Sequence, residues 1–343
     1  MADFPRKRAI IVGVDRYTDI TPLSFCGDDA REVASSFRKS LQFKKEDIFE
    51  FTTTSAVKPE RSKILGELGR LKSEGVGEDE LLIFYFSGHG MIDTKNNKDY
   101  LLPVDAAKFN LSLTGIRVED VVSDLKETGC KNIVMFIDAC REVVDGSKGV
   151  YSIGDDSKAA AGRAGIVSFF SCDPKEKSYE IQALGHGSFT YCILDAIAKG
   201  ECNTVAEINQ FLRKEVPLVN RKHDKPAQLP YAIVEPADKA DLAIFFSESR
   251  RQRVDTKYDD LADIMADKYA DGTLDDVWLN TSILLIEHAK SHELTEIEAR
   301  KFKLIESLAR GNMGAVSFPL AWKALERRTL GAPAAPDALG RLK

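Results

Sequence analysis

The sequence predicts an α/β fold: a mostly parallel sheet with helices on both faces, followed by a small C-terminal helical module. Two observations predict the sheet. Short apolar runs alternate with helical segments from residue 8 to residue 235. Most of these runs are apolar at successive positions, which is typical of strands buried on both faces. The module is predicted because the pattern beyond residue 250 is helical only.

The elements follow from their apolar spacing. The first strand is expected in RAIIVGV, residues 8–14, and the first helix at residues 28–41, where Ala30, Val33 and Phe37 recur at helical spacing. Further strands are expected at residues 47–53, 81–88, 100–105, 132–139, 165–172 and 229–235. Further helices are expected at residues 60–74, 119–128, 188–200 and 204–216.

A domain boundary is predicted where the character of the chain changes. Residues 250–260, RRQRVDTKYDD, are charged and lack apolar periodicity, so a linker is expected there. Beyond it, Thr295 and Glu298 form a capping-box pattern ahead of a helix. We therefore divide the chain into a domain at residues 1–248 and a linker with a helical module at residues 249–343.

Charge and composition exclude several function classes. With 48 Lys and Arg against 54 Asp and Glu, the formal net charge is −6, which disfavours binding to nucleic acid or to an anionic membrane. No apolar run approaches the ~20 residues of a membrane-spanning helix, and the N-terminus lacks a signal-peptide pattern, so a soluble, cytoplasmic protein is expected. The 6 cysteines show no C-x-x-C spacing, so neither a zinc site nor a disulfide framework is predicted, and no cofactor is required.

Two of the predicted strands end in reactive residues. LLIFYFSGHG ends with His89 between Gly88 and Gly90, and NIVMFIDAC ends with Cys140. Because ligand sites of open parallel sheets lie beyond the carboxyl ends of the strands, neighbouring strands would bring a thiol and an imidazole into one crevice. That pair suits nucleophilic catalysis by cysteine, since the imidazole can take the thiol proton. We expect the amides of Gly90 and Cys140 to stabilise a developing oxyanion.

The motifs FYFSGHG and FIDAC resemble the His and Cys motifs of the caspase-like cysteine peptidases (peptidase C14 type), in particular the metacaspase and bacterial orthocaspase branch. RKRAIIVGVDRY, LSFCGDDAREVASSF, YLLPVDA, IVSFFSCDPKEKSYE and GHGSFTYCILDAI match that family in the same order, over residues 7–245. The resemblance implies the caspase-hemoglobinase fold with about six strands, His89 as general base and Cys140 as the nucleophile of a cysteine endopeptidase. It also implies a large-subunit part, a linker loop and a small-subunit part, at residues 1–144, 145–164 and 165–248.

The resemblance further implies which bond is cut. Where animal caspases hold arginines that bind an Asp side chain, this chain has no Arg or Lys between Arg16 and Arg31. The positions that form an acidic pocket in metacaspases are filled by Cys26, Asp29, Ser87 and Asp138. Two carboxylates would hold a guanidinium and repel an Asp, so protein and peptide substrates cleaved after Arg, with Lys second, are expected. Asp28 is expected to cap the following helix. Asp173 is expected at the pocket rim, although a solvated loop carboxylate explains it equally well.

Three expectations concern regulation. Relatives often cut themselves between the two subunit parts, where this chain offers basic residues that an exposed loop also explains: Arg141, Lys148, Lys158 and Arg163. Some metacaspases need Ca²⁺, and three carboxylates lie loosely near the corresponding places, although solvated charges explain them too: Asp99, Glu119 and Asp120. By analogy with bacterial relatives, the helical module would bind an activating or sensor protein in a defence or cell-death pathway.

Two alternatives stay open. His186, in LGHGSF, is also flanked by glycines and is the rival base, although it precedes a helix rather than ending a strand. The fold could also serve as a catalytically silent scaffold that binds partners through its C-terminal helices. The presence of both His89 and Cys140 argues against a scaffold, because a scaffold has no need of the pair.

Overall fold

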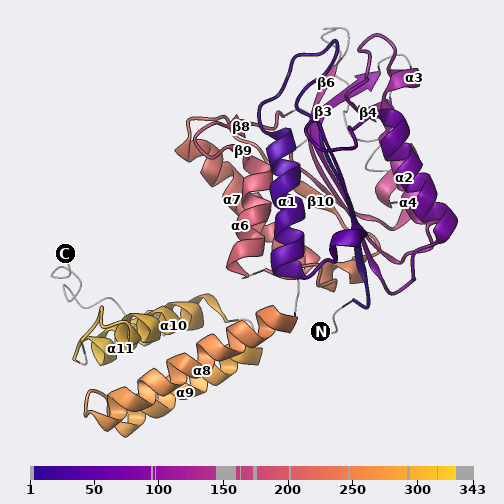
Figure 1. The fold of residues 1–343 in the computed structure, drawn as a ribbon. Helices are drawn as coiled ribbons and strands as arrows, with labels where there is room; N and C mark the ends of the chain where they lie inside the picture. The colour runs from indigo at the N-terminus through magenta and orange to yellow at the C-terminus, as the bar shows by residue number, and fades with distance from the viewer. Residues whose placement is uncertain are drawn as a thin grey trace. The chain divides into compact units, whose positions relative to one another are not determined.

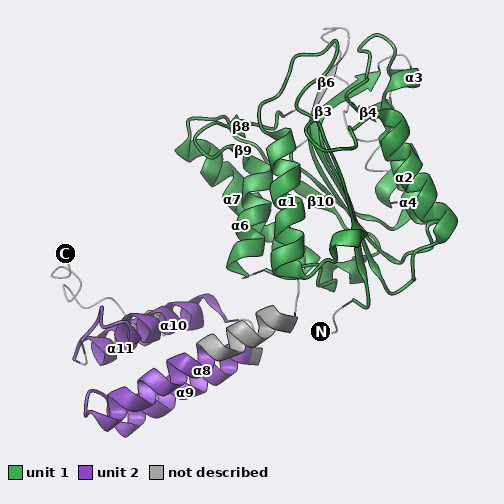
Figure 2. Ribbon diagram, viewed as in Figure 1, with its two compact units in different colours: residues 1–247 green, residues 248–343 purple. Residues whose placement is uncertain are grey.

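The computed structural model describes residues 4–93, 96, 98–143, 160–162, 164–172, 176–200, 202–245, 248–291, 294–314 and 316–329. The chain divides into two compact units, residues 1–247 and residues 248–343 (Figure 2). No helix among the described residues is long and apolar enough to cross a membrane.

The first unit is built on one large sheet (Figure 1). Its main path follows the order β10-β7-β6-β3-β1-β2, while β4 pairs with β3, and β5 with β4. The strands from β7 to β2 on this path are parallel, and β10 is antiparallel to β7. The predicted fold class is thereby confirmed. The strands are β1 (Lys7–Gly13), β2 (Ile48–Thr52), β3 (Leu81–Asp93), β4 (Lys98–Leu101), β5 (Ile116–Arg117), β6 (Asn132–Val143), β7 (Val167–Phe170) and β10 (Tyr231–Ile233), with β8 (Glu180–Ile181) and β9 (His186–Gly187) forming a separate pair.

Helices cover both faces of this sheet. One face packs against α1 (Cys26–Leu41), α6 (Ser188–Lys199) and α7 (Val205–Lys222), and the other against α2 (Arg61–Glu74) and α4 (Val118–Glu127) (Figure 1). Short helical segments connect these elements: η1 (Lys45–Asp47), α3 (Leu111–Thr114) and η2 (Ala237–Asp241).

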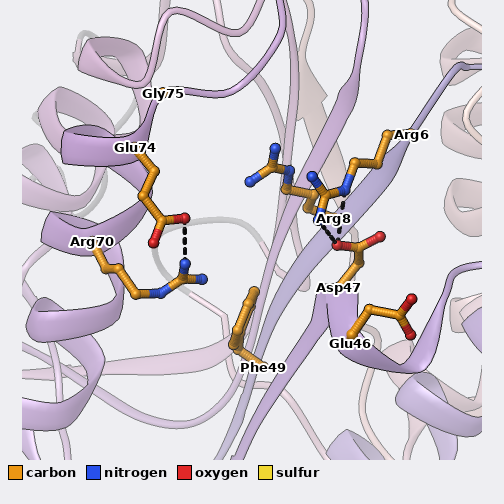
Figure 3. A pocket seen from close by; sticks show the side chains of 8 residues that line it. All are labelled: Arg6, Arg8, Glu46, Asp47, Phe49, Arg70, Glu74 and Gly75. Atoms are coloured by element: carbon orange, nitrogen blue, oxygen red, sulfur yellow. Dashed lines mark hydrogen bonds and ion pairs between the residues drawn. The ribbon is translucent and has the colours of Figure 1, made fainter.

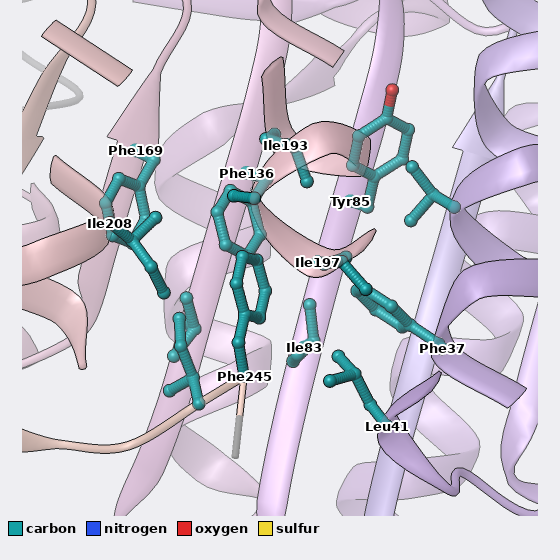
Figure 4. Close-up of a cluster of buried hydrophobic side chains, with 14 of the residues drawn as sticks. Phe37, Leu41, Ile83, Tyr85, Phe136, Phe169, Ile193, Ile197, Ile208 and Phe245 are labelled. Carbon is teal, nitrogen blue, oxygen red and sulfur yellow. The ribbon is translucent and has the colours of Figure 1, made fainter. Parts of the chain in front are cut away.

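Strand β3 shows why the central strands are apolar throughout. Ile83 and Tyr85 pack in the cluster that contains α1, α6 and α7 (Figure 4), whereas Leu82, Phe84 and Phe86 pack in the cluster that contains α2 and α4. Successive side chains of a strand point to opposite faces, so a strand covered on both sides needs an apolar residue at every position. Burial of each such side chain stabilises the fold by about 2 kcal/mol.

Two central strands continue beyond their neighbours. β1 ends at Gly13, opposite Ser87 of β3, but β3 and β6 stay paired as far as Val143. The prediction that β3 and β6 end just before His89 and Cys140 is therefore wrong, because both residues lie inside this paired extension. The strands continue because β3 keeps a backbone partner on each side, β6 on one and the antiparallel β4 on the other.

The second unit is helical, as predicted. A small apolar core joins its helices, which are α8 (Glu248–Ala270), α9 (Asp276–Ser291), α10 (Glu296–Ala309) and α11 (Ser317–Thr329). The capping box of Thr295 and Glu298 is confirmed, since each side chain bonds the backbone of the other residue. The predicted linker at residues 250–260 is wrong, because these residues belong to α8. Arg, Gln and Lys are good helix formers, so charge without apolar periodicity does not prevent a helix.

Candidate active site

His89 is held by contacts from the loop that follows β1. Its backbone N–H donates to Tyr17 Oη at 2.8 Å, and that hydroxyl donates to the carbonyl of Val14 at 2.9 Å. The two rings lie 5.1 Å apart, and His89 is buried. Gly88 permits this approach, because a Cβ there would lie 2.9 Å from Tyr17 Oη. The imidazole therefore has a defined position.

The ring contact of His89 fixes which nitrogen carries the hydrogen. Nε2 lies 2.9 Å from the carbonyl oxygen of Thr21. A carbonyl oxygen only accepts hydrogen bonds, so Nε2 carries the hydrogen in the neutral ring and Nδ1 keeps a lone pair. Nδ1 is thus the atom that can accept a proton from a nucleophile.

Cys140 lies beside His89 on the neighbouring strand. The two residues are register partners in the parallel β3–β6 pair, and neighbouring strands lie about 4.8 Å apart. The backbone thus brings the two candidate catalytic residues to one level of the sheet. The side chain of Cys140 lies outside the described residues, and the catalytic roles of both residues stay predictions.

The four residues predicted to form an acidic pocket line one small cavity. Its walls come from α1, β3, β6 and the segment around β8 and β9: Leu23, Cys26, Asp29, Ser87, Gly88, Asp138, Ser178, Tyr179, Glu180 and Gly187. The cavity holds about 30 Å³, which is room for about two water molecules.

Hydrogen bonds hold both buried carboxylates of the pocket. Asp138 accepts from Ser178 Oγ at 2.7 Å and from Thr190 Oγ1 at 2.8 Å. Asp29 Oδ1 lies 2.8 Å from His186 Nδ1, and Asp29 Oδ2 accepts from Ser87 Oγ at 3.3 Å. Both aspartates are almost fully buried, so these partners replace the water they have lost.

Burial also shifts the protonation of the pocket. It raises the pKa of Asp29 to about 7, with the nearby Asp138 adding to the rise and His186 opposing it. Burial likewise raises the pKa of Asp138, against the hydrogen bonds of Ser178 and Thr190. The pKa of the Cys26 thiol is raised well above its ordinary value by burial and by Asp29, so Cys26 is a neutral wall of the pocket and not a second nucleophile.

One predicted helix cap is wrong. α1 begins at Cys26 and its N-cap is Phe25, so Asp28 lies in the first turn, where it pairs with Arg31. The backbone N–H groups of Ser24 and Phe25 donate instead to Glu180 of β8, at 2.9 and 2.8 Å. A carboxylate at this position satisfies orphan N–H groups and complements the helix dipole.

The sequence analysis did not predict Glu180, which lines the pocket, or Gln228, which binds residues of its lining. Glu180 lines the cavity, and Gln228 donates to Ser178 Oγ at 3.2 Å while Ser188 Oγ donates to Gln228 Oε1 at 2.9 Å. Gln228 is fully buried. A lone Gln ahead of the strand β10 carries no local signal, and only its burial in the fold reveals the role.

The structure does not describe the side chains of several other predicted site residues, or gives only their place in a strand. Gly90 lies inside β3 in register with Leu101 and Arg141, and its oxyanion role stays a prediction. Arg141 lies in β6, and its side chain is outside the described residues. Four further residues also lie outside the described residues: Lys148, Lys158, Arg163 and Asp173.

The structure does not gather the predicted calcium ligands into a site. Glu119 pairs with Lys98 at 3.1 Å and with Arg117 at 2.6 Å, and Asp120 also pairs with Arg117. Asp99 is buried in β4. Among the described residues, no group of three or more His, Cys, Asp or Glu side chains could hold a metal ion. Glu119 and Asp120 are thus held by basic side chains, and a calcium site at these residues stays a prediction.

A second, larger cavity lies at the amino ends of β1 and β2 (Figure 3). It holds about 350 Å³. The arginines that line it are already paired: Arg6 with Asp47 at 2.5 Å, and Arg70 with Glu74. Arg8 reaches Glu80 at 2.8 Å. The cationic side chains of this region are therefore held in completed ion pairs.

An imidazole with a free lone pair, a cysteine in register with it and an adjoining acidic cavity are the parts of a cysteine peptidase of α/β type. The chain matches the caspase-domain family over residues 6–240. It therefore belongs to that family of cysteine peptidases.

Two solved structures are similar to this chain. A protein from Geobacter sulfurreducens is 15% identical, covers 70% of this chain and 98% of its own, and superposes with a TM-score of 0.50. Caspase-1 from Spodoptera frugiperda is 14% identical and covers 67% of this chain and 86% of its own, with a TM-score of 0.45. At this identity the likeness concerns the fold alone. The comparison with curated proteins returned no match.

Proposed function

We propose that this protein is a cysteine endopeptidase of the metacaspase and orthocaspase kind, which cleaves proteins after Arg and less well after Lys. The observation that carries the proposal is the pair of buried carboxylates, Asp29 and Asp138, in one cavity. No Lys or Arg lines this cavity among the described residues. A buried carboxylate pair without a permanent cation favours a ligand that brings one.

The pocket and the catalytic pair are spaced for one substrate residue. Ser87 and Asp138 are register partners, and His89 and Cys140 are the partners two positions further along. Two residues of a strand span about 6.6 Å and point to the same face. A substrate side chain in the pocket would thus leave its own carbonyl carbon near residue 140.

The proposed reaction proceeds through an acyl-enzyme. Nδ1 of His89 takes the thiol proton, and the sulfur of Cys140 attacks the scissile carbonyl carbon. The tetrahedral intermediate collapses as His89 returns that proton to the leaving amine, which gives a thioester and the first product. Water, deprotonated by His89, then attacks the thioester and releases the carboxylate product and the free thiol. Thr21 keeps the imidazole in the required tautomer throughout.

The test is a comparison of peptides that differ only in the residue before the reporter group. The full chain should release the reporter from Arg peptides fastest, from Lys peptides more slowly and from Asp peptides not at all. Cys140→Ala and His89→Ala should each abolish the release. No turnover of any peptide by a folded chain would point instead to a catalytically silent scaffold.

Regulation by self-cleavage is part of the proposal. Arg141, Lys148, Lys158 and Arg163 offer sites that match the proposed specificity. Incubation of the active chain should give fragments that Cys140→Ala does not give. Arg163→Ala should remove the main cut, and unchanged fragments from that variant would exclude this site. The helical unit would bind the activating or sensor protein, and its removal should then abolish activation without changing cleavage of small peptides.

A further inference from the structure

His186 contacts a buried carboxylate of the candidate pocket. It lies in β9, directly ahead of α6, and its Nδ1 is 2.8 Å from Asp29 Oδ1. The side chain of His186 is 20% exposed, whereas that of Asp29 is 1% exposed. The imidazole therefore links the buried carboxylate to solvent, where it can exchange a proton. This contact places the ring of His186 at the pocket, beside Asp29.

The neighbouring Gly187 lies beside both carboxylates of the pocket. Its backbone N–H donates to Asp29 Oδ2 at 3.3 Å. A Cβ at this residue would lie 3.0 Å from Asp138 Oδ2 and 3.2 Å from Asp29 Oδ2. The two residues of β9 thus reach both acids of the pocket, and any side chain at position 187 would fill the space between them.

The charged groups around the pair come from three elements. On α1, Asp28 and Glu32 face His186 and raise its pKa together with Asp29. Asp138 of β6 and the buried thiol of Cys26 face Asp29, and Glu180 of β8 lies 3.9 Å from that thiol. Asp28 is itself paired with Arg31 on the same helix. Among the described groups that contact Asp29 or Asp138, His186 is the one that can carry positive charge.

We propose that His186 is the titrating counter-ion of the candidate pocket: protonated, it satisfies Asp29 and weakens the binding of an Arg or Lys side chain, and neutral, it leaves Asp29 to the substrate. The inference rests on the proposed function, since it concerns the same pocket. It makes recognition of a basic residue depend on pH, separately from the chemistry at His89.

The size of the effect follows from proton linkage. Near neutral pH, loss of a proton makes the pair of Asp29 and His186 more negative, and a more negative pair attracts a cation more strongly. Burial raises the pKa of Asp29 to about 7, and the pKa of His186 is also raised. Affinity for a cation should accordingly rise about tenfold between about pH 6 and about pH 8. By reciprocity, a bound cation should lower the pKa of His186.

The experiment uses the full chain with Cys140→Ala and agmatine, a guanidinium on an aliphatic chain. Calorimetry at about pH 6 and pH 8 should show the tenfold gain in affinity, with proton release on binding that is larger at the lower pH. Imidazole ¹⁵N NMR should show the His186 signal titrating at lower pH when agmatine is saturating. His186→Gln assigns this signal by its loss, and His223, at the end of α7, provides the control that should not move.

Two variants sharpen the result. His186→Lys places a permanent charge beside Asp29 and should lower agmatine affinity at about pH 8 at least about tenfold, whereas His223→Lys should not. Gly187→Ala should weaken binding at every pH, because the added methyl group lies between the carboxylates. Thermal denaturation verifies that each variant is folded, and the unaltered pocket of the Cys140→Ala chain tests the proposal by itself.

The outcomes separate this inference from the proposed function. Agmatine binding without a pH-dependent affinity, or an unmoved His186 titration, would overturn the role of His186 and leave the specificity intact. Failure to bind agmatine at any pH would overturn both. Binding with the expected shift, in a chain that cleaves no peptide, would support the pocket and its counter-ion while removing the peptidase activity.

Discussion

Two groups of charged side chains lie at opposite ends of the same strands, and they differ in how their charges are balanced. At the amino ends, Arg6 and Arg8 each hold a carboxylate, so permanent charges cancel. At the carboxyl ends, among the described residues, Asp29 has only His186 as a cationic partner, and Asp138 has hydroxyl groups. The amino-end cavity is larger, about 350 Å³ against about 30 Å³. Unbalanced charge, and not cavity volume, therefore indicates where a ligand belongs.

The largest effect that would test this comparison is expected at Asp29. Asp29→Asn should lower kcat/KM for Arg peptides about 100-fold, because the guanidinium loses a charge-assisted partner in a desolvated pocket. Asp124→Asn is the matched control: that carboxylate lies in α4, pairs with Lys72 and should leave kcat/KM unchanged. Equal effects of the two variants would show that overall negative charge, and not the pocket, attracts the substrate.

A variant at the amino ends of the strands should lower stability and leave activity unchanged. Arg8→Met leaves Glu80 without its partner at 2.8 Å in a nearly buried position, and should lower the free energy of unfolding by about 2–3 kcal/mol. Urea denaturation measures this loss, while kcat/KM for Arg peptides should stay that of the original chain. A loss of activity in the folded variant would contradict the view that these ion pairs are only structural.

The raised pKa of Asp29 should make the stability of the folded chain depend on pH. Because burial raises the pKa of Asp29 from 3.8 to about 7 in the folded chain, the folded state holds a proton that the unfolded state releases. Stability is then lost as pH rises from about 4 to about 7. Asp29→Asn removes this loss, so at about pH 8 it should be more stable than the original chain by at least about 1 kcal/mol. The two melting temperatures should converge below about pH 4, and a constant difference would contradict the shift.

The smallest effect is expected at Arg70. Its side chain is 37% exposed, pairs with Glu67 and Glu74, and lies 4.6 Å from the ring centre of Phe49. Exposed pairs of this kind contribute about 0.5 kcal/mol, so Arg70→Ala should shift the urea midpoint only slightly. A loss as large as that of Arg8→Met would mean that the whole amino-end group acts as one network.

The layers of the fold could be predicted from the sequence because apolar spacing reports burial directly. Leu82, Ile83, Phe84 and Tyr85 face two cores in turn, and an unbroken apolar run of this length is typical of a strand covered on both sides. The ends of the strands could not be predicted, because β3 and β6 continue only where β4 and each other supply partners. The charged start of α8 was missed because helix propensity does not require an apolar stripe.

Motif resemblance indicated the residues of the candidate pocket, but not the residues that support them. Glu180 binds the backbone of Phe25 across 155 positions of sequence, and His186 binds Asp29 across 157. No local pattern reports a contact at that separation. The glycines beside His186 made it the rival base in the sequence, and the contact of its ring with Asp29 could not be predicted from them. The position of Asp28 favoured it as a helix cap, whereas Glu180 performs that role from a distant strand.

The paired extension of β3 and β6 has a consequence for how such a protein could change its substrates. Ser87 and Asp138 form one register pair of these strands, and His89 and Cys140 form the pair two residues further along. Side chains can be replaced without altering the backbone pairing of two strands. Ser87 and Asp138 can therefore be substituted while His89 and Cys140 keep their positions. The residues proposed for selectivity and those proposed for reactivity are then joined by one backbone, yet each pair can be replaced separately.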